Sequence, residues 1–259
     1  MTIGATTGQI GVEDLNYKYG AATIFDRVLR SDPTDTETIN RIMPTDIRAF
    51  GTEANAWNDA LAAAITAVGA EDAKLLVTVP QTLAANLTVP ANVELEFVPG
   101  AAITVGAYTA TFNGTIHAGL YEILVWTVGS GAININKNPY IYPQWFGALD
   151  DGTGEPATTA AFTECMNVNL TANQEKPTIA LHPGTYLVKE LTTTETDISI
   201  VGLFANATKE LGTTTSCAIL KSADGVSTID VNNIHVENIY FDGAGAGLVG
   251  IEGINLTVI

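Results

Sequence analysis

The chain has 259 residues, of which 46% are hydrophobic and 15% are charged, so its composition excludes a disordered protein. A formal net charge of −17, with 11 lysines and arginines, excludes nucleic-acid binding through a basic surface and argues against adhesion to an anionic membrane. The N-terminus lacks the basic start and apolar centre of a signal peptide, and no run reaches ~18 apolar residues. The sequence therefore predicts a folded protein that is made in a cytoplasm and has no membrane span.

The first 45 residues show no clear hydrophobic period. Residues 1–22 are rich in Gly and Thr, residues 23–30 form a short mixed segment, and residues 31–38 are acidic and rich in turn formers. We therefore expect residues 1–45 to form an extended N-terminal arm.

A first module is predicted over residues 46–142 and opens at an aromatic-glycine pair, Phe50-Gly51. Apolar residues then recur at helical spacing, with Asn55 or Asn58 as the N-cap and Gly69 as the end of the helix. Short strands follow, separated by Pro, Asn and Gly. The sequence VELEFV alternates strictly, which predicts a strand with one buried face. The predicted strands of this module include residues 74–80, 86–90 and 93–100.

The same layout restarts at Phe146-Gly147, which opens a second module over residues 143–259. Thr158 or Thr159 is the predicted N-cap of its helix. The apolar face of this helix consists of Ala161, Phe162, Cys165 and Met166. Short strands are predicted over residues 177–188, 197–202, 217–222, 228–231, 235–243 and 250–259.

The repeated short strands favour one architecture over another. A β-sandwich would also give short alternating strands. A parallel β-helix is favoured because the strands follow one another without hairpin dipeptides and look alike. The fold class predicted is therefore all-β, a right-handed parallel β-helix with short capping helices after an extended arm. Because Ile259 ends such a strand without a cap, we expect an N-terminal portion of a longer chain, or a second subunit over the open end.

Four short motifs follow one another in the second module. They are Phe146-Gly147-Ala148, the turn Asp151-Gly152, the helix from Thr158 to Met166, and Pro183-Gly184-Thr185-Tyr186. This order resembles the pectate-lyase-like parallel β-helix family of phage tailspikes and tail fibres. The resemblance covers about residues 46–259, and the first module is a degenerate copy with Gly51-Thr52-Glu53 at its entry.

The resemblance implies a function as well as a fold. It implies a homotrimer located in the virion tail, with residues 1–45 docking on a tail or baseplate protein. It implies that a region further along the β-helix recognises a host surface polysaccharide. It carries no evidence of activity by itself, because function lives in sites grafted on folds.

Candidate catalytic residues are Asp230, Glu237 and Asp242, which lie on adjacent predicted strands. Glycoside hydrolysis needs two carboxylates roughly 5–9.5 Å apart. With 28 acidic residues in the chain, neighbouring carboxylates are also expected by chance. Asp150 and Asp151 are better explained as turn formers. Any glycan-cleaving activity is expected on this β-helix or downstream of it, so the sequence assigns no enzyme activity to this part.

Other chemistry receives little support from the sequence. No arginine occurs after Arg48, which argues against a lyase that needs a basic residue. His117, His182 and His235 lack the spacing of a zinc site, so neither a metal nor a cofactor is predicted. The aromatic residues Trp126, Tyr140 and Trp145 are candidates for stacking on sugars, although such residues more often lie in a core or at a subunit contact.

Three hypotheses follow from these observations. The first is a structural virion protein, the N-terminal part of a trimeric tailspike or tail fibre. The second is a polysaccharide depolymerase, either a glycoside hydrolase or a lyase. The third is a bacterial surface adhesion β-helix, which the absence of a predicted signal peptide disfavours.

Overall fold

The protein has a mainly β fold with few helices. The computed structural model describes residues 44–51, 57–168, 176–189, 191–203, 218–222, 228–237, 239–242, 250–252 and 257–258. Helical segments in these ranges are η1 (Ile47–Ala49), α4 (Ala60–Val68), η3 (Pro143–Phe146) and α5 (Ala157–Met166). Of the predicted arm, residues 1–43 lie outside the described ranges.

The strands between residues 73 and 135 enter three parallel sheets in rotation. In chain order they are β2 (Ala73–Val77), β3 (Gln81–Thr82), β4 (Leu87–Val89), β5 (Val93–Phe97), β6 (Ile103–Thr104), β7 (Thr109–Phe112), β8 (Ile116–His117), β9 (Leu124–Val125) and β10 (Ala132–Ile135). Sheet I has the order β1-β2-β5-β8, where β1 is Thr45–Asp46; sheet II is β3-β6-β9, and sheet III is β4-β7-β10. Within this segment, each sheet therefore receives every third strand.

Neighbouring strands of sheets I to III come from segments 20 to 23 residues apart. Paired positions include Ala73 with Val93, Leu95 with Ile116, Gln81 with Ile103, and Leu87 with Ala110. This register places apolar side chains of successive strands directly beside one another. In sheet III, for example, Val89, Phe112 and Ile135 occupy matching positions and are all buried. Burial of each such side chain stabilises the fold by about 1.5–3 kcal/mol.

The alternation predicted for VELEFV is confirmed in β5. Val93, Leu95 and Phe97 are buried, whereas Glu94 and Glu96 are partly exposed. Because successive side chains of a strand point to opposite faces, the three apolar residues line the interior. The acidic pair lies on the outer face of sheet I.

The helix predicted before these strands is confirmed as α4, and Gly69 ends it as expected. The prediction that Asn58 caps it is wrong, because the helix begins after Asp59. The Asn58 Oδ1 atom instead accepts a hydrogen bond from the Thr82 amide of β3 at 3.0 Å. Asn58 thus satisfies a backbone group of an edge strand, where parallel sheets leave unpaired donors. The alternative cap, Asn55, lies outside the described residues.

The strands after residue 139 form two further parallel sheets. They are β11 (Tyr140–Ile141), β12 (Thr178–Leu181), β13 (Gly184–Val188), β14 (Leu191–Gly202), β15 (Ala218–Ser222), β16 (Thr228–Glu237), β17 (Ile239–Asp242), β18 (Gly250–Glu252) and β19 (Thr257–Val258). Sheet IV has the order β11-β12-β14-β16-β18, with β19 also paired to β16, and sheet V is β13-β15-β17. The strand predicted over residues 177–188 is therefore two strands in different sheets. They are separated at Pro183, which has no backbone N–H to donate to a ladder.

The second predicted helix is confirmed as α5, and all four residues of its predicted apolar face are buried. The predicted caps are wrong, because both threonines lie inside the helix. Thr158 Oγ1 accepts a hydrogen bond from the Leu149 amide at 3.1 Å. Thr159 Oγ1 accepts one from the Lys189 amide at 2.9 Å. These hydroxyls tie α5 to the chain before and after it instead of closing its first turn.

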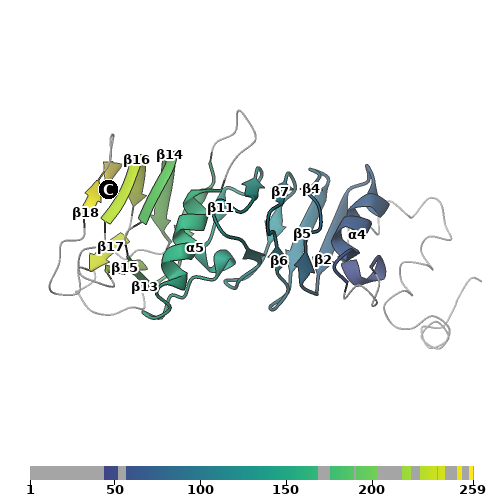
Figure 1. Ribbon diagram of the computed structural model, residues 1–259, viewed down its shortest axis with the longest axis horizontal. Helices are drawn as coiled ribbons and strands as arrows, with labels where there is room; N and C mark the ends of the chain where they lie inside the picture. The colour runs from purple at the N-terminus through teal and green to yellow at the C-terminus, as the bar shows by residue number, and fades with distance from the viewer. Residues whose placement is uncertain are drawn as a thin grey trace, which may run out of the picture.

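The elements follow one another along the long axis of the molecule in approximate chain order (Figure 1). The helix α4 lies beside β2, α5 and β11 lie in the middle, and β14, β16 and β18 lie toward the other end (Figure 1). Two hydrogen bonds connect η3 to the preceding half. The Ile123 amide donates to the Trp145 carbonyl at 2.9 Å, and Trp145 Nε1 donates to the Gly119 carbonyl at 3.0 Å. We call residues 119–123 together with η3 and α5 the joint.

Candidate functional site

The three candidate catalytic carboxylates occupy two sheets. Asp230 and Glu237 stand seven residues apart on β16 of sheet IV, and Asp242 ends β17 of sheet V. In the ladders, Asp230 pairs with Thr192 and Asp242 pairs with Lys221. Their roles in glycan cleavage stay a prediction.

The three candidate stacking residues differ in exposure. Trp145 is 2% exposed and Trp126 is 7% exposed, and both belong to the core. Tyr140 is 45% exposed on β11, so it is the one of the three that offers its ring to a ligand. Its neighbour Tyr142 packs edge-on against Trp145, with ring centroids 5.2 Å apart, and lies 5.6 Å from the His182 ring. A sugar-stacking role is therefore kept as a prediction for Tyr140.

The motif residues of the second module are accounted for by packing. Tyr186 is fully buried, accepts a hydrogen bond from Gln144 Nε2 at 2.7 Å and donates one to the His182 carbonyl at 3.1 Å. A Cβ atom on Gly184 would lie 2.6 Å from the Asp150 carbonyl oxygen, so this position requires glycine. Asp151 Oδ1 accepts a hydrogen bond from the Thr153 amide at 2.9 Å, which confirms its predicted role in a turn.

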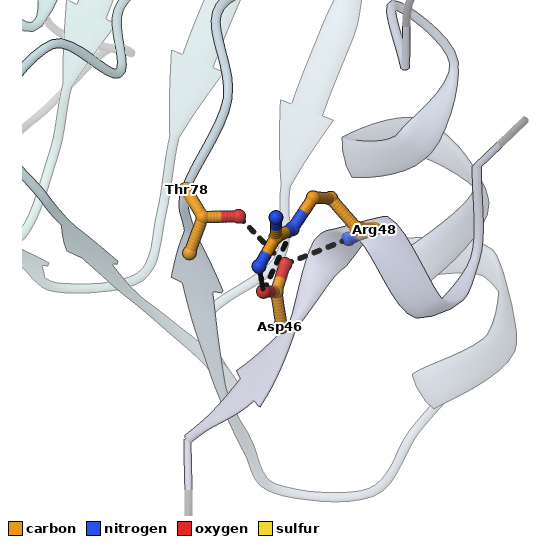
Figure 2. Close-up of polar contacts among 3 residues, drawn as sticks. All are labelled: Asp46, Arg48 and Thr78. Carbon is orange, nitrogen blue, oxygen red and sulfur yellow. Dashed lines mark hydrogen bonds and ion pairs between the residues drawn. The ribbon is translucent and has the colours of Figure 1, made fainter. Parts of the chain in front are cut away.

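The point where the arm enters the folded body is fixed by three polar side chains, Asp46, Arg48 and Thr78, which we call the entry clamp (Figure 2). The Asp46 carboxylate accepts hydrogen bonds from Arg48 Nη2 at 2.6 Å, from the Arg48 amide at 2.9 Å and from Thr78 Oγ1 at 2.7 Å. Burial disfavours the charged carboxylate, but these bonds outweigh burial and hold the pKa of Asp46 below its ordinary 3.8. The clamp joins β1 and η1 to the segment after β2.

Replacing Asp46 with asparagine is expected to lower the free energy of unfolding by about 1 kcal/mol at pH 7. Because folding lowers the pKa of Asp46, its stabilising contribution is complete above pH 3.8 and is lost as the pH falls through the folded value. The difference between wild type and Asp46→Asn should therefore narrow in acid. Urea denaturation at neutral and acidic pH measures it, and a difference that stays constant would contradict the assignment.

Two carboxyl groups from distant segments meet at the joint. Glu164 lies on α5 and is 8% exposed, and Glu122 lies in the segment before β9. A Cβ atom on Gly147, at the end of η3, would lie 3.0 Å from Glu122 Oε1. Burial, and secondly the nearby Glu122 carboxylate, raise the pKa of Glu164 from 4.5 to about 8. Glu164 is therefore mostly protonated at neutral pH.

Ion pairs of sheet I run between neighbouring strands on its outer face. Lys74 Nζ lies 2.8 Å from Glu96 Oε2, and His117 Nε2 lies 3.6 Å from Glu94 Oε2. These groups are partly exposed, so each pair contributes less than about 1 kcal/mol. The described residues contain no group of three or more His, Cys, Asp and Glu side chains placed to hold a metal ion.

No family model matches the chain, and comparisons with curated proteins and with solved structures find no match. In the part of the chain that the structure describes, no helix combines the length and apolar character that a membrane crossing needs.

Sequence reasoning missed both polar clusters described above. Thr78 lies 32 residues from Asp46, and Glu122 and Glu164 are 42 positions apart in the chain, so no local motif joins the members of either cluster. Only the strand register brings such residues together. The entry clamp can fix a chain segment, and the carboxyl pair can bind or release a proton.

Proposed function

We propose that the protein is a right-handed parallel β-helix and forms part of a trimeric phage tailspike or tail fibre. The observation that carries the proposal is the rotation of strands through sheets I, II and III, with paired positions 20 to 23 residues apart. Parallel pairing of each strand with the third strand along the chain is typical of a solenoid. A right-handed path is supported by the strong preference of parallel crossover connections for that hand.

The helices fit the same proposal. The helix α4 packs beside η1 and β2 near the first strands of the sheets, and its neighbour Asn58 occupies a backbone donor of the edge strand β3. Covering the open end of a parallel stack prevents it from pairing with other chains. The helix α5 begins the second set of strands, as the resemblance to tailspikes implies.

The entry clamp supports a role for residues 1–45 in attachment. A segment that docks on a virion must transmit force to the body of the spike. Asp46 and Arg48 hold the first described strand against the segment after β2 through several hydrogen bonds (Figure 2). We therefore propose that the arm binds a tail or baseplate protein and that the body carries host recognition.

Light scattering and a binding assay test this proposal. We expect the chain to elute with a mass three times 27.2 kDa and to be retained by purified tail particles. A variant that lacks residues 1–45 should keep the trimeric mass and lose retention. A stable monomer that no virion component retains would contradict the proposal.

A polysaccharide depolymerase is the second candidate. It is favoured by the placement of Asp230, Glu237 and Asp242 on the consecutive strands β16 and β17. Release of reducing ends from capsule or lipopolysaccharide by this chain, abolished in Glu237→Gln, would support it. No release from any host glycan that binds the chain would exclude it for these residues.

A further inference from the structure

The joint holds two carboxyl groups with no cation to neutralise them. Among the described residues, no lysine, arginine or histidine forms an ion pair with Glu122 or Glu164. Glu164 is largely removed from water on α5, and the Glu122 carboxylate lies close to the backbone of Gly147. A buried carboxyl group beside a second carboxylate is tolerated when one of the two carries a proton.

The packing around Glu164 transmits this condition to the contact between the two halves. The helix α5 packs on η3, and η3 is hydrogen-bonded through Trp145 to Gly119 and Ile123. Glu122 belongs to that same short segment. Repulsion between the two carboxylates therefore acts across the surface where the second half rests on the first.

We propose that the Glu122–Glu164 pair is a proton-dependent lock, which holds α5 and η3 against residues 119–123 while Glu164 is protonated and loosens them when it ionises. Because folding raises the pKa of this acid from 4.5 to about 8, the native joint binds the proton more tightly than the open one. The joint is then most stable below pH 4.5, weakens steadily between pH 4.5 and 8, and levels off above about pH 8.

Other titratable groups around α5 do not supply this transition. The helix η3 carries none. The described groups near α5 other than Glu122 are Cys165 on the helix, Tyr186 of β13, Asp197 of β14, and Glu155 paired with Lys189 at 3.8 Å. Burial raises the pKa of Cys165 and of Tyr186 away from the neutral range. Glu164 is thus the group whose charge changes near pH 8.

Hydrogen exchange followed by mass spectrometry tests the lock on the whole chain between pH 6 and pH 9, with labelling times corrected for intrinsic exchange. In wild type, protection of peptides within residues 140–166 should fall about 10- to 100-fold over this range, while peptides within residues 93–112 keep theirs. In Glu164→Gln the fall should disappear. In Glu122→Gln it should be smaller and level off at a lower pH.

The control Glu71→Gln removes one exposed carboxylate beyond α4 and should behave as wild type. Carbon-13 NMR of wild type labelled at its glutamate carboxyls gives an independent reading, with one resonance expected to titrate near pH 8. Equal pH dependence in wild type and Glu164→Gln, or titration of every glutamate below pH 6, would overturn the proposal.

Discussion

Replacing Gly114 with alanine is expected to destabilise the protein by about 3–5 kcal/mol, the largest effect that we predict for a single substitution. Gly114 is buried between β7 and β8 and rests on the preceding bend of the chain. A Cβ atom there would lie 1.7 Å from the Val93 carbonyl oxygen and 2.9 Å from the Pro90 carbonyl oxygen. Both contacts are with backbone, so relief requires a shift of two neighbouring strands. Thermal and urea denaturation measure the loss.

Gly106→Ala is the matched control for this change. Gly106 has a φ of +60°, and no atom lies within 4 Å of the point that a Cβ atom would occupy, so alanine there meets backbone strain without a collision. We expect a cost of about 1 kcal/mol. If Gly114→Ala costs no more than this control, the close approach of the strands at Gly114 is wrong.

Gln81→Leu is expected to cost about 3 kcal/mol, because it removes a buried amide that connects α4 to sheet II. Gln81 is 1% exposed. Its Oε1 accepts a hydrogen bond from the Leu61 amide at 3.1 Å, and its Nε2 donates to the Trp57 carbonyl at 2.8 Å and to the Pro80 carbonyl at 2.9 Å. The first amides of a helix lack partners within it, so Gln81 satisfies from the sheet what a cap residue otherwise would. Leucine has a similar size and leaves these groups unpaired.

Asn58→Ala provides the comparison, because it removes a single hydrogen bond, to the Thr82 amide, from a more exposed place in the same region. Its expected cost is about 1 kcal/mol. Melting temperatures of the two variants, measured side by side, should therefore differ by several degrees. Equal melting temperatures would show that Gln81 does not connect the helix to the sheet.

The sequence was informative where one periodicity decides the structure. Alternation in VELEFV determines the buried face of β5, and the helical spacing of apolar residues determines the buried face of α5. Gly69 ends α4 because its φ of +60° suits glycine. Each of these features depends on residues within about ten positions of one another, so a local pattern suffices to predict it.

Polar side chains were predicted poorly for the opposite reason. Asn58, Thr158 and Thr159 are good cap residues by type, yet each side chain bonds to a segment brought near by the strand register. The Glu122–Glu164 pair depends on the same register and has no local signature. A side chain with one hydrogen-bond acceptor takes the partner that the packed structure offers, and in a parallel stack that partner comes from the next layer.

The constant separation of paired strands between residues 73 and 135 also bears on how this part assembles. Each pairing closes a loop of 20 to 23 residues, so the entropic cost of closure is nearly equal at every step. No step has to wait for the ends of the segment to meet. Folding can then begin at one strand pair and proceed to its neighbours, with a rate governed by local contacts and not by the length of the chain.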